Sequence, residues 1–178
     1  MEAELREVVA QLQLRRLVDD YAGAADRQDG PGFAGVFTPD GILEVRQQGY
    51  IEPLVHAEGS EELAAVMLLF NPFLYTQHLV CNHRVTLAPD GRSGTGETYC
   101  LANHVSDAPG GRQNLMQFIR YLDQYVLTDG GWRFARRDNL VRWQQIVPVT
   151  TMPLVLDPAH PPTPTRLAED FWPVGPGV

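Results

Sequence analysis

Apolar and polar positions in the first 75 residues follow the 3.6-residue period of amphipathic helices. Apolar side chains recur at helical spacing through Leu17, Val18, Tyr21 and Ala25, and a similar stripe precedes them. One helix is therefore predicted over about 4–28. Because it presents a single apolar face, we expect it to pack on a larger element.

Two shorter helices are predicted after this one. Asp29 offers an N-cap with Pro31 at a first helical position, which favours a short helix that ends before Pro39. Ser60 is expected to cap another helix, which ends before Pro72. Short strands are predicted between these two helices, over 42–47 and 50–52.

The pattern changes after residue 75 to long runs that are typical of β-strands. Turn sequences rich in Gly, Pro and Asp separate them. The predicted strands cover 75–88, 94–105, 113–128 and 132–147. Helices first and a long-stranded antiparallel meander afterwards predict an α+β fold, with helices packed on one face of a curved sheet.

The last 31 residues differ from the rest, since they contain eight of the 14 prolines. Proline lacks a backbone donor, so regular structure is not expected over most of this segment. We therefore divide the chain into a domain over 1–147 and a tail over 148–178. The tail is expected to pack on the domain or on a neighbouring subunit. Its apolar anchors would be Leu154, Leu156, Phe171 and Trp172.

The composition narrows the classes of function. With 178 residues, 44% of them hydrophobic, the chain suits one domain whose core can enclose a pocket. A formal net charge of -8 opposes binding to nucleic acid and to anionic membranes. Cys81 and Cys100 lack metal-site spacing and are interpreted as buried, reduced thiols. No apolar run approaches the roughly 18 residues of a membrane span, so we expect a cytoplasmic protein.

Two residues carry the candidate chemistry. Asp26 lies near the end of the first helix and His78 lies in the first long strand. A histidine can remove a proton when its other ring nitrogen donates to a carboxylate, so these two would form a proton-transfer pair if the fold brings them together. Tyr21 lies about 140° from Asp26 on an ideal helix, so both can line one pocket only if the helix end distorts or the pocket is wide.

The two-residue period of strands assigns other side chains to faces. His78 and Asn82 should share one face, while His83 faces the opposite way unless a bulge intervenes. His104 shares its face with small residues that would leave room for a ligand, namely Gly96, Thr98, Cys100 and Ala102. Arg120 is the single charge among the apolar residues of its face, and such a charge needs an anionic or carbonyl partner when buried. Metal binding by His78, His83 and His104 is not expected, because their faces differ.

Each candidate also has a structural interpretation. Asp26 can end a helix or pair with an arginine, and His78 can be a core histidine. Arg120 can be the structural partner of Asp26, Asp123 or Glu44. Five further residues are candidate substrate contacts or core residues: Tyr50, Met67, Phe70, Asn82 and Trp143.

The order of these features resembles the SnoaL-like branch of the nuclear transport factor 2 superfamily, which includes scytalone dehydratase, bile-acid 7-alpha-dehydratase and hexachlorocyclohexane dehydrochlorinase. The resemblance rests on Tyr21, Asp26, Phe33, Phe37, Asp40, Gly41, Thr76, His78, Asn82, Arg120, Asp123, Tyr125 and the run 129–133. It implies a cone-shaped α+β barrel around a deep apolar pocket. In the eliminating enzymes it implies an Asp/His dyad at Asp26 and His78.

The leading expectation is a lyase or isomerase without a cofactor, acting on a small, mainly apolar hydroxy or keto compound. His78 would be the base, Asp26 would orient it, and Tyr21, His104 or Arg120 would polarise the oxygen. Alternatives are a polyketide cyclase, which closes a ring by aldol chemistry, and a non-catalytic binding or assembly domain. A ketosteroid-isomerase-like mechanism is disfavoured, because Val45 follows Glu44 where that family has its aspartate base. No Asp/Arg/Asp set of the limonene-epoxide-hydrolase kind could be placed.

We also expect a homodimer or homotrimer. A curved open sheet leaves a face and edges that association with another copy would cover.

Overall fold

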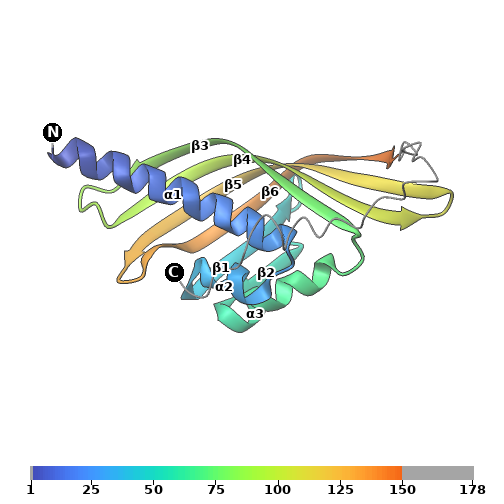
Figure 1. Cartoon of the computed structure of the whole chain (residues 1–178), viewed down its shortest axis with the longest axis horizontal. Helices are drawn as coiled ribbons and strands as arrows, with labels where there is room; N and C mark the ends of the chain where they lie inside the picture. Colours follow the sequence, from blue (N-terminus) through green and yellow to red (C-terminus); the bar gives the residue numbers. More distant parts are fainter. Residues whose placement is uncertain (1, 150–178) are drawn as a thin grey trace, which may run out of the picture.

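A curved, open sheet of six strands forms the frame of the molecule, as described for residues 2–149 in a computed structural model (Figure 1). The strands are β1 (Phe37–Gln47), β2 (Val55–Glu58), β3 (Tyr75–Leu87), β4 (Ser93–Ala108), β5 (Gly111–Thr128) and β6 (Gly131–Val149). The helices are α1 (Glu2–Asp26), α2 (Gly30–Gly35), α3 (Gly59–Ala65) and the 3-10 helix η1 (Val66–Phe70). The predicted α+β class is confirmed.

The strand order is β2-β1-β6-β5-β4-β3. Strands β3 to β6 form the predicted antiparallel meander. Strand β1 adds to it differently, because it runs parallel to β6 and pairs antiparallel with β2 on its other side. The sheet is therefore mixed, and β1 joins the helical part of the chain to β6, the edge strand of the meander.

Helix α1 lies obliquely across the sheet and contacts β3 most extensively (Figure 1). Its buried residues Leu14, Val18 and Tyr21 follow the predicted apolar stripe. The Tyr21 ring packs against Phe33 of α2 and Phe134 of β6, with centroid distances of 4.7 and 5.9 Å. These aromatic contacts fix the second half of α1 over the sheet.

Several predicted boundaries around the short elements are wrong. Strand β1 begins at Phe37 and continues through Pro39, where a helix end was predicted. Its register with β6 shifts between Phe37 and Ile42, so the proline lies in an irregular stretch that needs no ladder donor. The second short strand is Val55–Glu58 instead of 50–52.

Helix α3 begins two residues earlier than predicted. Glu58, not Ser60, is its N-cap, and it makes no side-chain cap hydrogen bond. Instead the carboxylate of Glu62 accepts the backbone N–H of Glu58 at 2.9 Å. The helix then tightens into η1 over Val66–Phe70. The Glu62 side chain thus accepts a backbone hydrogen bond at the start of the helix, where no side chain of the N-cap residue does so.

Strand β3 contains a bulge that changes which residues face inward. Val80 pairs with Cys100 but His83 pairs with Thr98, so two β3 residues stand opposite Tyr99. Such an insertion reverses the alternation beyond it. His83 therefore shares the inner side with His78, and its Nε2 lies 3.1 Å from the Oη of Tyr125.

The remaining predictions concern the tail, the two cysteines and membrane spans. The tail predicted over 148–178 lies outside them apart from residues 148 and 149, which end β6, and its four apolar anchors are not described. Of the two free thiols, Cys100 is buried as predicted but Cys81 is exposed at the bulge. No helix within residues 2–149 is long and apolar enough to cross a membrane.

Candidate active site

Asp26 and His78 meet where the last turn of α1 crosses β3. The Nδ1 of His78 lies 2.7 Å from Oδ1 of Asp26, and the backbone N–H of His78 donates to Oδ2 of the same carboxylate at 3.0 Å. The side chain of His78 is 6% exposed. Because the carboxylate occupies Nδ1, the proton on that atom is held there and Nε2 is left with its lone pair.

His78 lines a cavity of about 200 Å³ on the concave side of the sheet. Its wall is mostly apolar and aromatic, with residues from α1, α2, η1 and all six strands, of which β2 contributes Val55 alone. The lining comprises Tyr21, Ala25, Phe33, Leu43, Val45, Val55, Val66, Leu69, Phe70, Phe73, His78, His104, Leu115, Gln117, Ile119, Tyr121, Asn139 and Val141. An engineered cavity of about 150 Å³ holds benzene, so this one suits a compact ligand.

His104 lies beside His78 in the cavity wall. The rings of His78 and His104 are perpendicular with centroids 5.5 Å apart, and the ring centroid of Phe73 lies 4.8 Å from that of His104. Burial lowers the pKa of His104 to about 4, and His78 adds to this lowering. His104 is therefore neutral near pH 7. Its buried Nδ1 has no hydrogen-bond partner within residues 2–149, so it is available to a ligand.

The buried His104 should make the free energy of unfolding depend on pH. The unfolded chain takes up a proton on this residue below about pH 6.5, whereas the folded chain resists it until about pH 4. Stability is therefore retained above pH 6.5 and lost as the pH falls toward 4, by up to about 3 kcal/mol. Urea denaturation of wild type and His104→Phe at several pH values measures this loss. Equal pH dependence in both proteins would contradict it.

Tyr21 lines the cavity from the C-terminal part of α1, whereas Asp26 reaches it only through His78. The two residues lie about 140° apart on the helix and need not share one face, because Asp26 contacts His78 and is not itself in the cavity wall. Tyr21 is 4% exposed, and burial raises its pKa, so its hydroxyl stays protonated. Its Oη accepts a hydrogen bond from Nδ2 of Asn139 at 3.0 Å.

A buried ion pair lies beneath this part of the cavity. Arg137 and Asp123 are 0% and 3% exposed and make two hydrogen bonds, of 2.7 and 2.8 Å. The guanidinium carbon lies 4.2 and 4.4 Å from the ring centroids of Tyr21 and Tyr121. Tyr125 donates its hydroxyl proton to Asp123 at 2.7 Å. The motif that contains Asp123 and Tyr125 therefore supports the cavity from below without opening into it.

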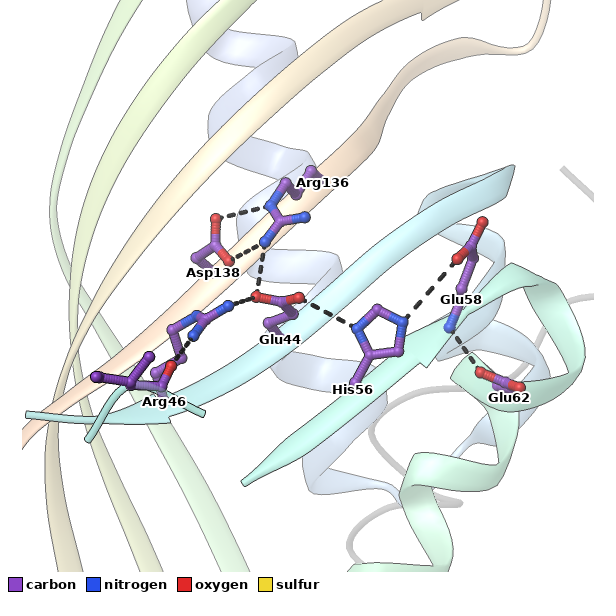
Figure 2. A network of polar contacts seen from close by, with 8 residues as sticks. Glu44, Arg46, His56, Glu58, Glu62, Arg136 and Asp138 are labelled. Carbon is purple, nitrogen blue, oxygen red and sulfur yellow. Dashed lines mark hydrogen bonds and ion pairs between the residues drawn. The ribbon is translucent and has the colours of Figure 1, made fainter. Parts of the chain in front are cut away.

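A second charged network lies on the outer face of β1, β2 and β6. Figure 2 shows Glu44 in contact with Arg46, Arg136 and His56. Burial raises the pKa of Glu44, but hydrogen bonds from Arg46 and His56 and the charge of Arg136 outweigh this and lower it. The cavity wall contains Leu43 and Val45 but not Glu44. An acid at this position is therefore directed away from the cavity and cannot act as a base within it.

Arg120, predicted as a possible oxygen-polarising group, lies outside the cavity. Its Nε donates to Oε1 of Glu97 at 2.7 Å on the outer side of the sheet. The cavity is lined instead by its neighbours Ile119 and Tyr121. The partner is none of the three carboxylates proposed from the sequence, since Glu97 lies diagonally opposite Arg120, two residues from its cross-strand partner Tyr99.

Four of the five expected substrate contacts also lie elsewhere. Tyr50 and Asn82 are exposed, in the β1–β2 turn and at the β3 bulge, and Trp143 is 58% exposed and stacks on Phe118 outside the sheet. Met67 belongs to the buried core and is not in the cavity wall. Only Phe70 lines the cavity, because η1 directs it toward His78 and His104.

Asn139, Gln117, Phe73 and Tyr121 line the cavity but were not predicted to contact a ligand. A signal for Asn139 exists in the sequence. It is a polar residue two positions from the apolar Val141 in a strand whose inner positions follow a two-residue period. A buried amide at such a position needs partners, which makes it a binding candidate. Phe73 lies in a loop and carries no such pattern.

Comparisons with known proteins agree with this architecture. The model of a family described as the SnoaL-like domain matches residues 6–138. An uncharacterized protein of Mycobacterium tuberculosis is 28% identical over 141 residues, which cover 79% of this chain and 91% of that protein. An uncharacterized protein of Mycobacterium bovis has the same identity and coverage.

Solved structures provide the second comparison. A putative scytalone dehydratase from Novosphingobium aromaticivorans superposes with a TM-score of 0.68 at 19% identity, covering 85% of this chain and 97% of that one. A hexachlorocyclohexane dehydrochlorinase, LinA-type3, from Novosphingobium barchaimii also has a TM-score of 0.68, at 16% identity, and covers 86% and 99%. At these identities the likeness establishes a shared fold.

Proposed function

The chain belongs to the SnoaL-like domain family, and from this premise we propose that it is a lyase or isomerase that needs no cofactor and acts on a small, mainly apolar hydroxy or keto compound. The observation that carries the proposal is the contact of 2.7 Å between Asp26 and His78 at the wall of an apolar cavity. The two structural neighbours described above are named for eliminations, one a dehydration and the other a dehydrochlorination.

In the proposed reaction, Nε2 of His78 removes a proton from a substrate carbon next to a carbonyl or a leaving group. The electron pair of the broken C–H bond forms a double bond. In a dehydration the C–O bond breaks, and the departing hydroxyl takes the proton that Nε2 of His78 removed and leaves as water, which returns the ring to its neutral form. Asp26 stabilises the imidazolium that His78 becomes. Tyr21 and His104 are neutral and face the same cavity; His104 lies beside His78 and is the proposed donor to the reacting oxygen.

The apolar wall supports this chemistry in two ways. It excludes water from His78, and it strengthens the electrostatic effect of Asp26 on the ring. A charged substrate would lose its hydration without gaining a partner, since no Lys, Arg, Asp or Glu occurs in the described cavity wall. The proposed substrate is therefore neutral.

Incubating the full chain in deuterium oxide with a panel of small alcohols, ketones and polycarbonyl compounds tests the proposal. We expect at least one compound to show elimination, isomerisation or deuterium exchange at a carbon next to an oxygen-bearing carbon. The same compound should be nearly inert with His78→Gln. Ring-closed products from polycarbonyl compounds would identify a cyclase instead. Binding without any turnover or exchange would favour the non-catalytic alternative.

The homodimer or homotrimer stays a prediction, as does the cytoplasmic location. An apolar outer face supports association: Leu79, Tyr99 and Trp143 are 43%, 47% and 58% exposed there. Covering such a surface with a second copy would remove it from water.

A further inference from the structure

Tyr21 and Asn139 leave hydrogen-bonding capacity unused in the cavity wall. They are 4% and 7% exposed, and Nδ2 of Asn139 donates to Oη of Tyr21 at 3.0 Å. Oδ1 of Asn139 is buried without a partner among residues 2–149. The hydroxyl proton of Tyr21 likewise has no acceptor in that part of the chain. Leaving such buried groups unsatisfied is costly, which indicates that a ligand group meets them.

Counting donors and acceptors defines that group. With the amide as placed, the pair offers the O–H of Tyr21 and the second N–H of Nδ2 as donors, and Oδ1 of Asn139 as an acceptor. If the amide is reversed, Oδ1 accepts the tyrosine proton and the pair offers Nδ2 as donor and Oη as acceptor. At least one donor and one acceptor remain in both cases. A hydroxyl group satisfies both at once, whereas a carbonyl or a halide can only accept.

The pair lies away from the proposed base. His78 pairs with Ala102 of β4, which in turn pairs with Gln117 of β5. Asn139 pairs with Tyr121 of β5. These two β5 positions are four residues apart, roughly 13 Å along an ideal strand. The hydroxyl that meets Tyr21 and Asn139 is therefore separate from the carbon that would meet His78.

Arg137 strengthens the donor. Its guanidinium lies under the ring of Tyr21, 4.2 Å from the centroid, and is held there by Asp123. A cation at this position opposes the rise in the pKa of Tyr21 that burial causes. The phenol stays protonated but is a better hydrogen-bond donor than an isolated buried tyrosine.

We propose that Tyr21 and Asn139 form a hydroxyl-binding site that selects a neutral, hydroxylated substrate and orients it with its reacting carbon toward His78. The orienting part rests on the proposed function, whereas the binding part does not. Under this proposal the cavity prefers an alcohol or a phenol to a halide or hydrocarbon of the same shape.

Fluorine NMR titration of the full chain with para-fluorophenol and para-fluorotoluene tests the proposal, because the probes differ only in one hydroxyl or methyl group. Wild type should bind para-fluorophenol about tenfold more tightly than para-fluorotoluene. Tyr21→Phe and Asn139→Leu should each remove most of this preference and leave the affinity for para-fluorotoluene within about twofold. Tyr21→Phe removes a single hydroxyl, so it carries the test even if Asn139→Leu does not fold.

Two control variants separate this site from the proposed base. His78→Gln should keep the preference for para-fluorophenol, so a failure of the catalytic proposal leaves this result intact. His104→Phe removes the other unpartnered polar group of the cavity. If the preference disappears in His104→Phe and survives in Tyr21→Phe, the hydroxyl binds elsewhere and the proposal is wrong. Equal affinity of wild type for the two probes, or binding of neither, would also overturn it.

Discussion

Substitution of His78 by Gln is expected to lower turnover of the substrate found in the panel by about 10²–10⁴-fold. The ring supplies the only basic nitrogen that the described cavity wall combines with a carboxylate partner. Glutamine is polar and of similar size but cannot take up a proton. The free energy of unfolding should change little, and steady-state kinetics together with urea denaturation measure both quantities.

Asp26→Asn should lower turnover by a comparable factor, because the amide no longer stabilises the imidazolium. If the two residues act as one unit, the double variant with His78→Gln should be no slower than the slower single variant. The exposed Asp20, on the same helix, provides the control. Asp20→Asn should keep full activity. Multiplicative effects of the two dyad substitutions would show that they act independently and would contradict the mechanism.

Asp123→Asn is expected to lower the free energy of unfolding by about 3–5 kcal/mol. The substitution removes the counter-charge of Arg137, which is 0% exposed. Burial alone would lower the pKa of Arg137, and the charge of Asp123 is the main cause that raises it instead. The guanidinium cannot escape to water, and aromatic rings replace only part of the lost attraction. Because the same ion pair supports Tyr21, ligand binding should weaken as well.

Urea denaturation with a double-variant cycle measures this effect. Arg137→Met alone should also destabilise, because it leaves the carboxylate of Asp123 buried without its cation. Asp123→Asn combined with Arg137→Met should lose less than the sum of the single changes, since no charge of this pair then remains buried. Glu97→Gln breaks the solvent-accessible pair with Arg120 on the other face of the same strands and should change stability little. Similar losses from Asp123→Asn and Glu97→Gln would contradict the assignment.

The faces of the strands show where sequence reasoning reached its limit. A strict two-residue period separates His78 from His83, yet the β3 bulge brings both to the inner side. In β5 the same period holds, since Tyr121, Asp123 and Tyr125 lie on the side opposite Arg120. The period is a local property of the backbone, whereas a bulge depends on the register with the neighbouring strand.

Two arginines illustrate the same limit. Arg120 was singled out because apolar residues surround it in its strand, but those residues form the outer face. Arg137 is the buried arginine, although Arg136 beside it is just as basic in the sequence. Which of two adjacent arginines faces inward follows from the pairing of β6 with β5 and β1, which no single strand reveals.

By itself, the sequence determined the order of helices and strands, the long antiparallel meander and the two residues with suitable chemistry, Asp26 and His78. Helix period, strand period and turn residues are local, so they can be read without the rest of the chain. Tertiary structure alone decided that these two side chains, 52 positions apart, make contact, and that Tyr21 and Asn139 line the same cavity. Those juxtapositions arise from the curvature of the sheet and the packing of α1 across it, which are properties of the assembled fold.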